Sequence, residues 1–187
     1  MLKKELKSNF ALRGSIRAYL VDIQKNNKAF RMFKEIEERK KNGLPFLEML
    51  KQFNSMFGIM VWNDHNLNPT VGRTMVINNL CNASPTYVPL INYTALGTGI
   101  TAPAAGDTQL ETETYRKVPF SRTNSNNVGY VTAAYTAAEC SGSYKECGLF
   151  SAATASANSG VLVVRAAINI TKTTSQILTI DHTLTLS

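Results

Sequence analysis

The chain has few of the residues from which disulfide frameworks and metal sites are built. Three cysteines occur among 187 residues, none in a CxxC spacing, and the only histidines are His65 and His182. An odd set of cysteines without paired spacing argues against a disulfide framework and against a structural zinc site. Cys140 and Cys147 flank a plausible hairpin loop, SGSYKE, and could face each other. Free thiols are the expectation for a protein made in the cytoplasm.

Signatures of membrane spans and of common catalytic sites are also missing. No run of about 18 apolar residues occurs, so no transmembrane helix is expected. No apolar stretch follows the basic start MLKKELKSNF, so a secretory signal is not expected either. Neither GxSxG nor HExxH is present, and aromatic residues do not alternate with basic ones as in a nucleic-acid-binding sheet. We therefore expect no catalytic residue, cofactor, metal or small-molecule substrate, and neither a nucleic-acid nor a membrane partner.

The segment LGTGITAPAAGD, residues 96–107, has glycines spaced as in a phosphate-binding loop. Such a loop also needs a helix N-terminus behind the glycines and usually a lysine. This segment has no Gly-Lys-Ser/Thr sequence and leads into Pro103 instead of a helix. We interpret Gly97 and Gly99 as architecture, because glycine permits a positive φ or a close approach of backbones at the end of a strand.

Positive charge is concentrated in the first third of the chain. Residues 1–60 hold 13 Lys and Arg against 6 Asp and Glu, whereas residues 61–187 hold 7 of each. The net charge of +7 therefore belongs to the first segment, which could bind nucleic acid, an anionic membrane or an acidic protein surface, or could be a solvated helical face. Composition also changes near residue 60, toward Thr, Ala, Asn, Ser and Val. The sequence thus predicts two regions, 1–60 and 61–187.

The first region is predicted to be partly helical. IRAYLVDI indicates a strand that enters a hairpin turn at Asn26-Asn27, with a helix as the alternative. FRMFKEIEERKKNG has apolar residues at helical spacing and Gly43 in C-cap position. Pro45 is expected at the first position of a second helix, in PFLEMLKQFNSMF. The two helices would form a hairpin whose apolar stripe is core or a subunit interface.

The second region has the alternation of β-structure. GIMVWNDHN is expected to be a strand and PTVGRTMVINNL a short helix, after which VLVVRAAINI and ILTIDHTLTLS alternate apolar and polar residues. His182 falls on the apolar face of the last strand, where a hydrogen-bonded core histidine is expected. Strands separated by turns alone predict an antiparallel β-sandwich, so the whole chain is mainly β with an N-terminal helical hairpin insertion.

Longer motifs stand in a fixed order along the second region: NDHNLNPTVGRTMVINNL, YTALGTGITAPAAGDTQLETETYRK and ECGLF. In this order they resemble a family of virion proteins of tailed bacteriophages. The resemblance covers residues 60–187 and leaves the helical stretch 30–57 as an insertion. The positions that carry it are Asn66, Gly72, Arg73, Gly97, Gly99, Pro103, Asp107, Leu110, Glu113, Arg116, Glu146, Gly148, Leu149, Phe150 and Lys172.

The resemblance implies a β-sandwich module that assembles on phage particles as part of a fibre, collar, tail tip or capsid decoration, without catalysis. The implied partners are other virion proteins of capsid, neck or tail, and the implied location is the virion, after assembly in the bacterial cytoplasm. Fibres and decorations are usually cyclic oligomers, so a homotrimer is expected, and the basic region 1–60 is expected to dock onto the particle. The alternative is a carbohydrate- or receptor-binding module of a phage fibre. The single tryptophan, Trp62, counts against it, because Trp62 is placed in a predicted strand and not in a loop.

An ion-pair network is expected among Glu113, Arg116, Glu146 and Arg165. Glu146 stands directly before CGLF, which is expected to enter the core, and a charge held beside a core strand needs a partner. We predict that some of these residues pair and hold the loop after Gly99 against the sheet. A catalytic carboxylate is the alternative interpretation.

Overall fold

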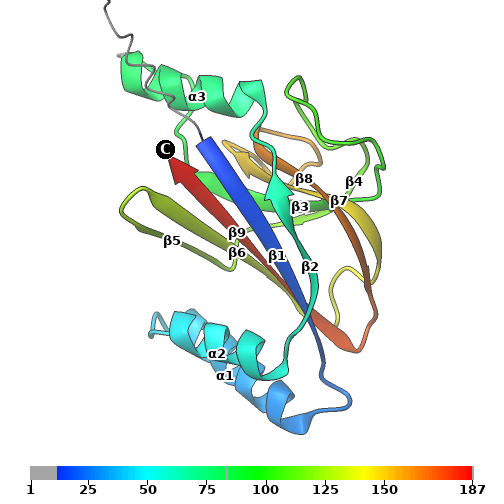
Figure 1. Cartoon of the computed structure of the whole chain (residues 1–187). Helices are drawn as coiled ribbons and strands as arrows, with labels where there is room; N and C mark the ends of the chain where they lie inside the picture. The colour runs from blue at the N-terminus through cyan, green and yellow to red at the C-terminus, as the bar shows by residue number, and fades with distance from the viewer. Residues whose placement is uncertain (1–11, 83, 187) are drawn as a thin grey trace, which may run out of the picture.

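The computed structural model describes residues 12–82 and 84–186, and its strands form two antiparallel sheets (Figure 1). In chain order the elements are β1 (Leu12–Asp22), α1 (Asn27–Lys41), α2 (Leu47–Phe57), β2 (Ile59–Asn66), α3 (Thr70–Cys81), β3 (Ile91–Gly97), β4 (Glu113–Lys117), β5 (Ser121–Ser125), β6 (Val128–Tyr135), β7 (Gly142–Ser151), β8 (Val161–Lys172) and β9 (Gln176–Leu186). No helix among the described residues is long and apolar enough to cross a membrane.

The two sheets face each other across a shared core. One has the strand order β2-β1-β9-β6-β5 and the other β4-β3-β7-β8, with antiparallel neighbours throughout. Buried side chains from both sheets meet between them, among them Ile16, Leu96, Ile168 and Ile180. The prediction of a mainly β chain with an antiparallel sandwich is therefore confirmed.

The alternation in the last strands produces the buried face that the sequence predicts. Leu178, Ile180 and His182 are all buried on β9. His182 is only 2% exposed, and burial lowers its pKa to about 4, because the charged imidazolium would lose its hydration. The expected core histidine is thus confirmed in position, but its Nδ1 has no hydrogen-bond partner among the described residues.

The helical hairpin is inserted between two paired strands. Asn26, expected in a turn, is instead the N-cap of α1, and its Oδ1 accepts a hydrogen bond from the Ala29 N–H at 3.0 Å. The strand that pairs with β1 is β2, which arrives only after α2. Gly43 follows the end of α1 with φ of +68°, as a C-terminal glycine should. Pro45 was expected inside α2 but lies before it, since Phe46 is the N-cap.

The apolar stripe of the hairpin is core, as predicted. Phe33 of α1 and Phe53 of α2 are buried with ring centroids 5.4 Å apart, and Phe120, which precedes β5, packs against Phe33. These rings cover Val21 and Ile177 of the five-stranded sheet. The hairpin therefore forms a second apolar cluster on the side of this sheet that faces away from the sandwich core.

The boundary predicted at residue 60 falls inside β2 and does not separate two structural units. β1 pairs with β9 from Leu12 to Asp22, and the two strands run side by side through the middle of the molecule (Figure 1). The N-terminal third thus supplies an interior strand of the sheet as well as the helical hairpin. The first 11 residues of the basic region lie outside the described residues.

The three cysteines are free, as expected, but two of them lie in places that the sequence did not predict. Residues 142–151 form β7, so the segment between Cys140 and Cys147 is mostly strand instead of a hairpin loop. Cys147 is 1% exposed in the sandwich core, and burial raises the pKa of its thiol. Cys140 is partly buried, which raises its pKa to about 11. Cys81 is exposed.

Candidate functional site

The glycine-rich segment encloses a carboxylate that belongs to the protein itself. Glu146 of β7 is 1% exposed. Its Oε1 accepts hydrogen bonds from the backbone N–H groups of Thr112 at 2.7 Å and Gly99 at 3.2 Å, and its Oε2 accepts one from Glu111 at 3.0 Å. Convergent backbone N–H groups are what an anion site requires. Here Glu146 is the anion that these N–H groups bind, so they are already occupied and not open to a phosphate.

Glycine is needed at both positions because the Glu146 side chain comes very close to the backbone there. A Cβ on Gly97 would lie 2.6 Å from Oε1 of Glu146, and a Cβ on Gly99 would lie 2.5 Å from the same atom. Neither distance is compatible with a side chain, and neither glycine has a positive φ. Of the two reasons offered by the sequence, the close approach is therefore the one that applies.

Arg165 of β8 neutralises Glu146 and extends the network to the loop after Gly99. Its Nε donates to Oε2 of Glu146 at 3.0 Å, its Nη1 to Oδ2 of Asp107 at 2.6 Å and its Nη2 to the Thr101 carbonyl at 3.1 Å. Burial acts to lower the pKa of Arg165, but Asp107 and Glu146 outweigh it and raise that pKa. The predicted ion pair of Glu146 and Arg165 is thus present, and it contacts the loop after Gly99.

Asp107 is a member of this network that sequence reasoning did not include. Burial acts to raise the pKa of Asp107, but the Ala104 N–H, which donates at 2.8 Å, and the Arg165 guanidinium outweigh it and lower that pKa. Asp107 therefore closes the loop on itself and ties it to β8. The sequence pointed to Asp107 only through its position in the motif LGTGITAPAAGD, eight residues after Gly99.

Glu113 and Arg116 form a separate buried ion pair that fastens a different loop. Their side chains are 2% and 4% exposed, and Nη2 of Arg116 donates to Oε2 of Glu113 at 2.7 Å. Arg116 also donates to the Thr154 carbonyl, and Glu113 accepts from the Asn158 N–H. The guanidinium lies 4.7 Å from the ring centroid of Phe150. The pair therefore holds the loop 152–160, which the sequence did not predict.

The apolar motif residues close the core beneath these pairs. Leu110, Leu149 and Phe150 are all fully buried. Gly148 allows Leu110 to reach this core, because a Cβ on Gly148 would lie 3.0 Å from Leu110 Cδ2. The structure thus brings these motif residues together, and they pack in the core.

The remaining motif residues are spread over the other parts of the sandwich. Gly72 lets α3 approach β8, since a Cβ there would lie 2.8 Å from the Leu162 carbonyl oxygen. Asn66 pairs with Gly14 at the end of β2, and exposed Arg73 donates to Oγ1 of Thr70 at 3.1 Å. The others are Pro103, half-buried in the loop, and Lys172, whose buried Nζ donates to the carbonyls of Ala137, Glu139 and Thr173.

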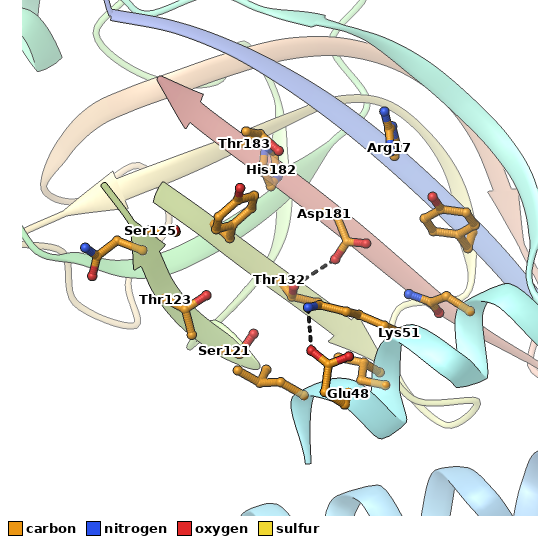
Figure 2. Close-up of a pocket in the computed structure, with 16 residues that line it drawn as sticks. Arg17, Glu48, Lys51, Ser121, Thr123, Ser125, Thr132, Asp181, His182 and Thr183 are labelled. Atoms are coloured by element: carbon orange, nitrogen blue, oxygen red, sulfur yellow. Dashed lines mark hydrogen bonds and ion pairs between the residues drawn. The ribbon is translucent and has the colours of Figure 1, made fainter. Parts of the chain in front are cut away.

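A groove of about 470 Å³ lies between α2 and the side of the five-stranded sheet that faces away from the core (Figure 2). Most of the residues that line it have polar side chains, and we call it the polar groove. Arg17, Asp181, Thr132 and Ser121 are direct cross-strand neighbours on β1, β9, β6 and β5. The adjoining row carries further hydroxyl groups, from Ser15, Thr183, Tyr130 and Thr123. From α2, the groove is lined by Leu47, Glu48, Leu50, Lys51 and Asn54.

The groove combines hydrogen-bond donors and acceptors with a partly buried carboxylate, that of Asp181. Oγ1 of Thr132 donates to Oδ1 of Asp181 at 2.7 Å. Burial raises the pKa of Asp181, and the Thr132 hydrogen bond and the Arg17 charge offset part of this effect. Asn54 is 7% exposed, yet its Oδ1 has no hydrogen-bond partner among the described residues. Lys51 and Glu48 form an exposed ion pair on the helix opposite Thr132, drawn as a dashed line in Figure 2.

Sequence reasoning missed this groove, although one signal was present. The alternation in ILTIDHTLTLS sets Thr179, Asp181, Thr183 and Thr185 on the face opposite the apolar one, and three of these four residues carry hydroxyl groups. The groove itself requires strands and a helix that are far apart in the sequence. Within the ranges 12–82 and 84–186, no group of three or more His, Cys, Asp or Glu side chains is placed to hold a metal ion.

Comparison of this chain with protein-family models, with curated proteins and with solved structures finds no match.

Proposed function

We propose that this chain is a non-enzymatic structural protein of a tailed-bacteriophage particle, which docks on the capsid, neck or tail as a decoration, collar or fibre-attachment protein. The observation that carries the proposal is that the buried charged residues pair with one another inside the protein. Glu146 and Arg165 are saturated with partners inside the protein, as are Glu113 and Arg116. Side chains committed in this way stiffen loops and are closed to a substrate, which fits a module that must keep its shape in an assembly.

The helical hairpin is the proposed docking element. Lys28, Arg31, Lys34 and Lys41 are exposed on α1. The same inserted segment and the strand after it also expose Leu44, Met56 and Ile59, at 51%, 55% and 72%. A segment that exposes both positive charges and apolar side chains fits an acidic patch on another virion protein. We also propose a homotrimer as the assembling unit, because virion components commonly follow cyclic symmetry.

Incorporation into particles tests this proposal. Replacement of Lys28, Arg31 and Lys34 by serine should lower the amount of this chain in gradient-purified particles about tenfold, since each exposed ion pair contributes about 0.2–1 kcal/mol. Attachment of the parent chain to particles should also weaken as the salt concentration rises, because exposed charges are screened over about 10 Å at 0.1 M. Quantitative mass spectrometry of the particles provides the measurement.

A matched control separates docking from a general effect of charge. It removes the same charge outside the hairpin, by serine substitutions at Arg73, Arg122 and Lys145. This control should incorporate like the parent. Equal loss in both variants would show that the hairpin is not the docking element, and absence of the parent chain from purified particles would refute the structural role itself.

The polar groove favours a second candidate function, a carbohydrate- or receptor-binding module of a phage fibre. Its lining residues include Tyr19 and Tyr130, and Tyr130 is 43% exposed. Aromatic rings beside hydrogen-bonding groups are what a saccharide-binding surface needs, so the single Trp62 of the sequence does not decide against this candidate. Both functions are compatible in one chain, because the docking charges lie on α1, whereas the groove is lined by α2 and the five-stranded sheet.

A further inference from the structure

The polar groove holds hydrogen-bonding capacity that the protein does not use. Asp181 accepts one hydrogen bond, at Oδ1 from Thr132, and Asn54 Oδ1 accepts none from the described residues. Leaving the buried Oδ1 of Asn54 without a partner costs about 1–3 kcal/mol. Both groups line the same cavity, one from the sheet and one from α2. A ligand hydroxyl or amide that donates to Asn54 would recover this cost, and another could donate to Asp181.

The charges around the groove select an uncharged ligand. Its lining has two cationic side chains, Arg17 and Lys51, and two anionic ones, Glu48 and Asp181. Lys51 and Glu48 already neutralise each other at 2.6 Å, and Arg17 stands opposite Asp181 across β1 and β9. A phosphorylated or sulfated ligand would find no net positive charge here. The groove therefore differs in charge from α1, which exposes Lys28, Arg31, Lys34 and Lys41.

The remaining groups match a ligand rich in hydroxyls. The hydroxyls of Ser121, Thr123 and Thr183 can each donate and accept, and Thr132, which donates to Asp181, can still accept. In the same row of the sheet, the Asp181 carboxylate can accept hydrogen bonds from ligand hydroxyls and the Arg17 guanidinium can donate to them. Tyr130 adds a partly exposed ring, on which the apolar face of a sugar can lie. The volume of about 470 Å³ lies within the range of small-ligand sites, about 300–1,000 Å³.

We propose that the groove between α2 and the five-stranded sheet binds a neutral saccharide, with Asp181 and Asn54 as its hydrogen-bonding contacts and Tyr130 as its stacking surface. The inference deepens the second candidate function and is independent of the docking role. A chain that joins particles without binding sugar, or binds sugar without joining particles, would therefore separate the two.

The test uses the purified full chain on an immobilised panel of neutral oligosaccharides built from glucose, galactose, mannose and N-acetylhexosamines. Sialylated and sulfated oligosaccharides serve as the charged comparison. Any neutral oligosaccharide that binds is then titrated by calorimetry against Asp181→Asn and Tyr130→Ala. Each substitution should weaken binding at least about tenfold, the loss expected for one buried hydrogen bond or one stacking contact. Tyr130→Ala changes a partly exposed residue, so it provides a folded variant if Asp181→Asn is unstable.

Asp64→Asn is the matched control, since it makes the same chemical change on exposed β2, outside the groove. It should bind like the parent. The proposal is overturned if the parent binds no neutral member of the panel, if it binds only charged members, or if the groove variants bind as tightly as the control. Melting curves of all variants show whether a loss of binding is a loss of fold.

Discussion

Removing the guanidinium of Arg165 should be among the most damaging single changes in this protein. Arg165→Met would leave Glu146, which is 1% exposed, as a buried carboxylate without its cation. It would also remove the 2.6 Å contact with Asp107 and the hydrogen bond to the Thr101 carbonyl. Breaking a buried ion pair from one side costs about 3–5 kcal/mol. For a chain of this length each kcal/mol lowers the Tm by about 2–4 °C, so we expect a decrease of about 6–20 °C.

Glu146→Gln should cost less, because Asp107 would still neutralise Arg165. The glutamine oxygen can accept from the N–H groups of Gly99 and Thr112, but its NH₂ group would then face the N–H of Glu111. We expect a loss of about 1–3 kcal/mol from these unmatched donors. The double variant should be at least about 1 kcal/mol more stable than the sum of the two single losses, since each single change isolates the charge of the other residue.

Thermal and urea unfolding, followed by circular dichroism, measure these differences. Lys34→Met is the control, because it breaks an exposed pair with Glu37 and should cost less than about 1 kcal/mol. If Arg165→Met costs no more than this control, and if the Arg165 and Glu146 effects simply add, the buried network does not hold the loop after Gly99 and the reasoning is refuted.

Two further predictions concern buried titratable groups. The pKa of His182 is about 4 in the folded protein and near 6.5 in the unfolded chain, so the unfolded chain binds the extra proton first as the pH falls. The contribution of His182 to the free energy of unfolding should therefore be complete above pH 6.5 and decline by about 3 kcal/mol toward pH 4. Urea titrations between pH 4 and pH 6.5 measure this decline of the unfolding free energy with pH. His182→Leu should remove the part that His182 causes, and the control His65→Gln should keep it. An equal decline in the parent and in His182→Leu would contradict the assignment. Cys147→Ser should lower stability by about 1–3 kcal/mol, because it places a hydroxyl in the apolar core, whereas Cys140→Ser should cost less than about 1 kcal/mol. Equal losses in reduced samples would show that Cys147 is not in the core.

The sandwich could be predicted because its pattern is local. Alternation along β9 indicates a strand whatever its neighbours are, and the spacing of Phe33 and Ile36 indicates a helix in the same way. The errors occur where one residue type serves two local structures. Asn26 fits a turn and an N-cap equally well, and a proline such as Pro45 can stand before a helix as well as at its first position.

The candidate sites were only partly predictable, because they depend on contacts between distant segments. The pairing of Glu146 with Arg165 followed from a general rule, that a carboxylate beside a core strand needs a cation. The pairing of Glu113 with the loop 152–160 and the row that joins Arg17 to Asp181 depend on strand order and register. No local pattern specifies which strand lies beside β9, so the groove emerged only from the fold.

The central claim, that this chain is a structural part of a phage particle, is tested most directly by electron cryomicroscopy of purified particles that carry a tag fused to its C-terminal end. The account predicts tag-dependent density at a fixed position on the capsid, neck or tail, in symmetry-related copies, with a sandwich facing outward and the helical hairpin against the particle. Particles that lack this density while the tagged chain remains soluble in the lysate would contradict the claim.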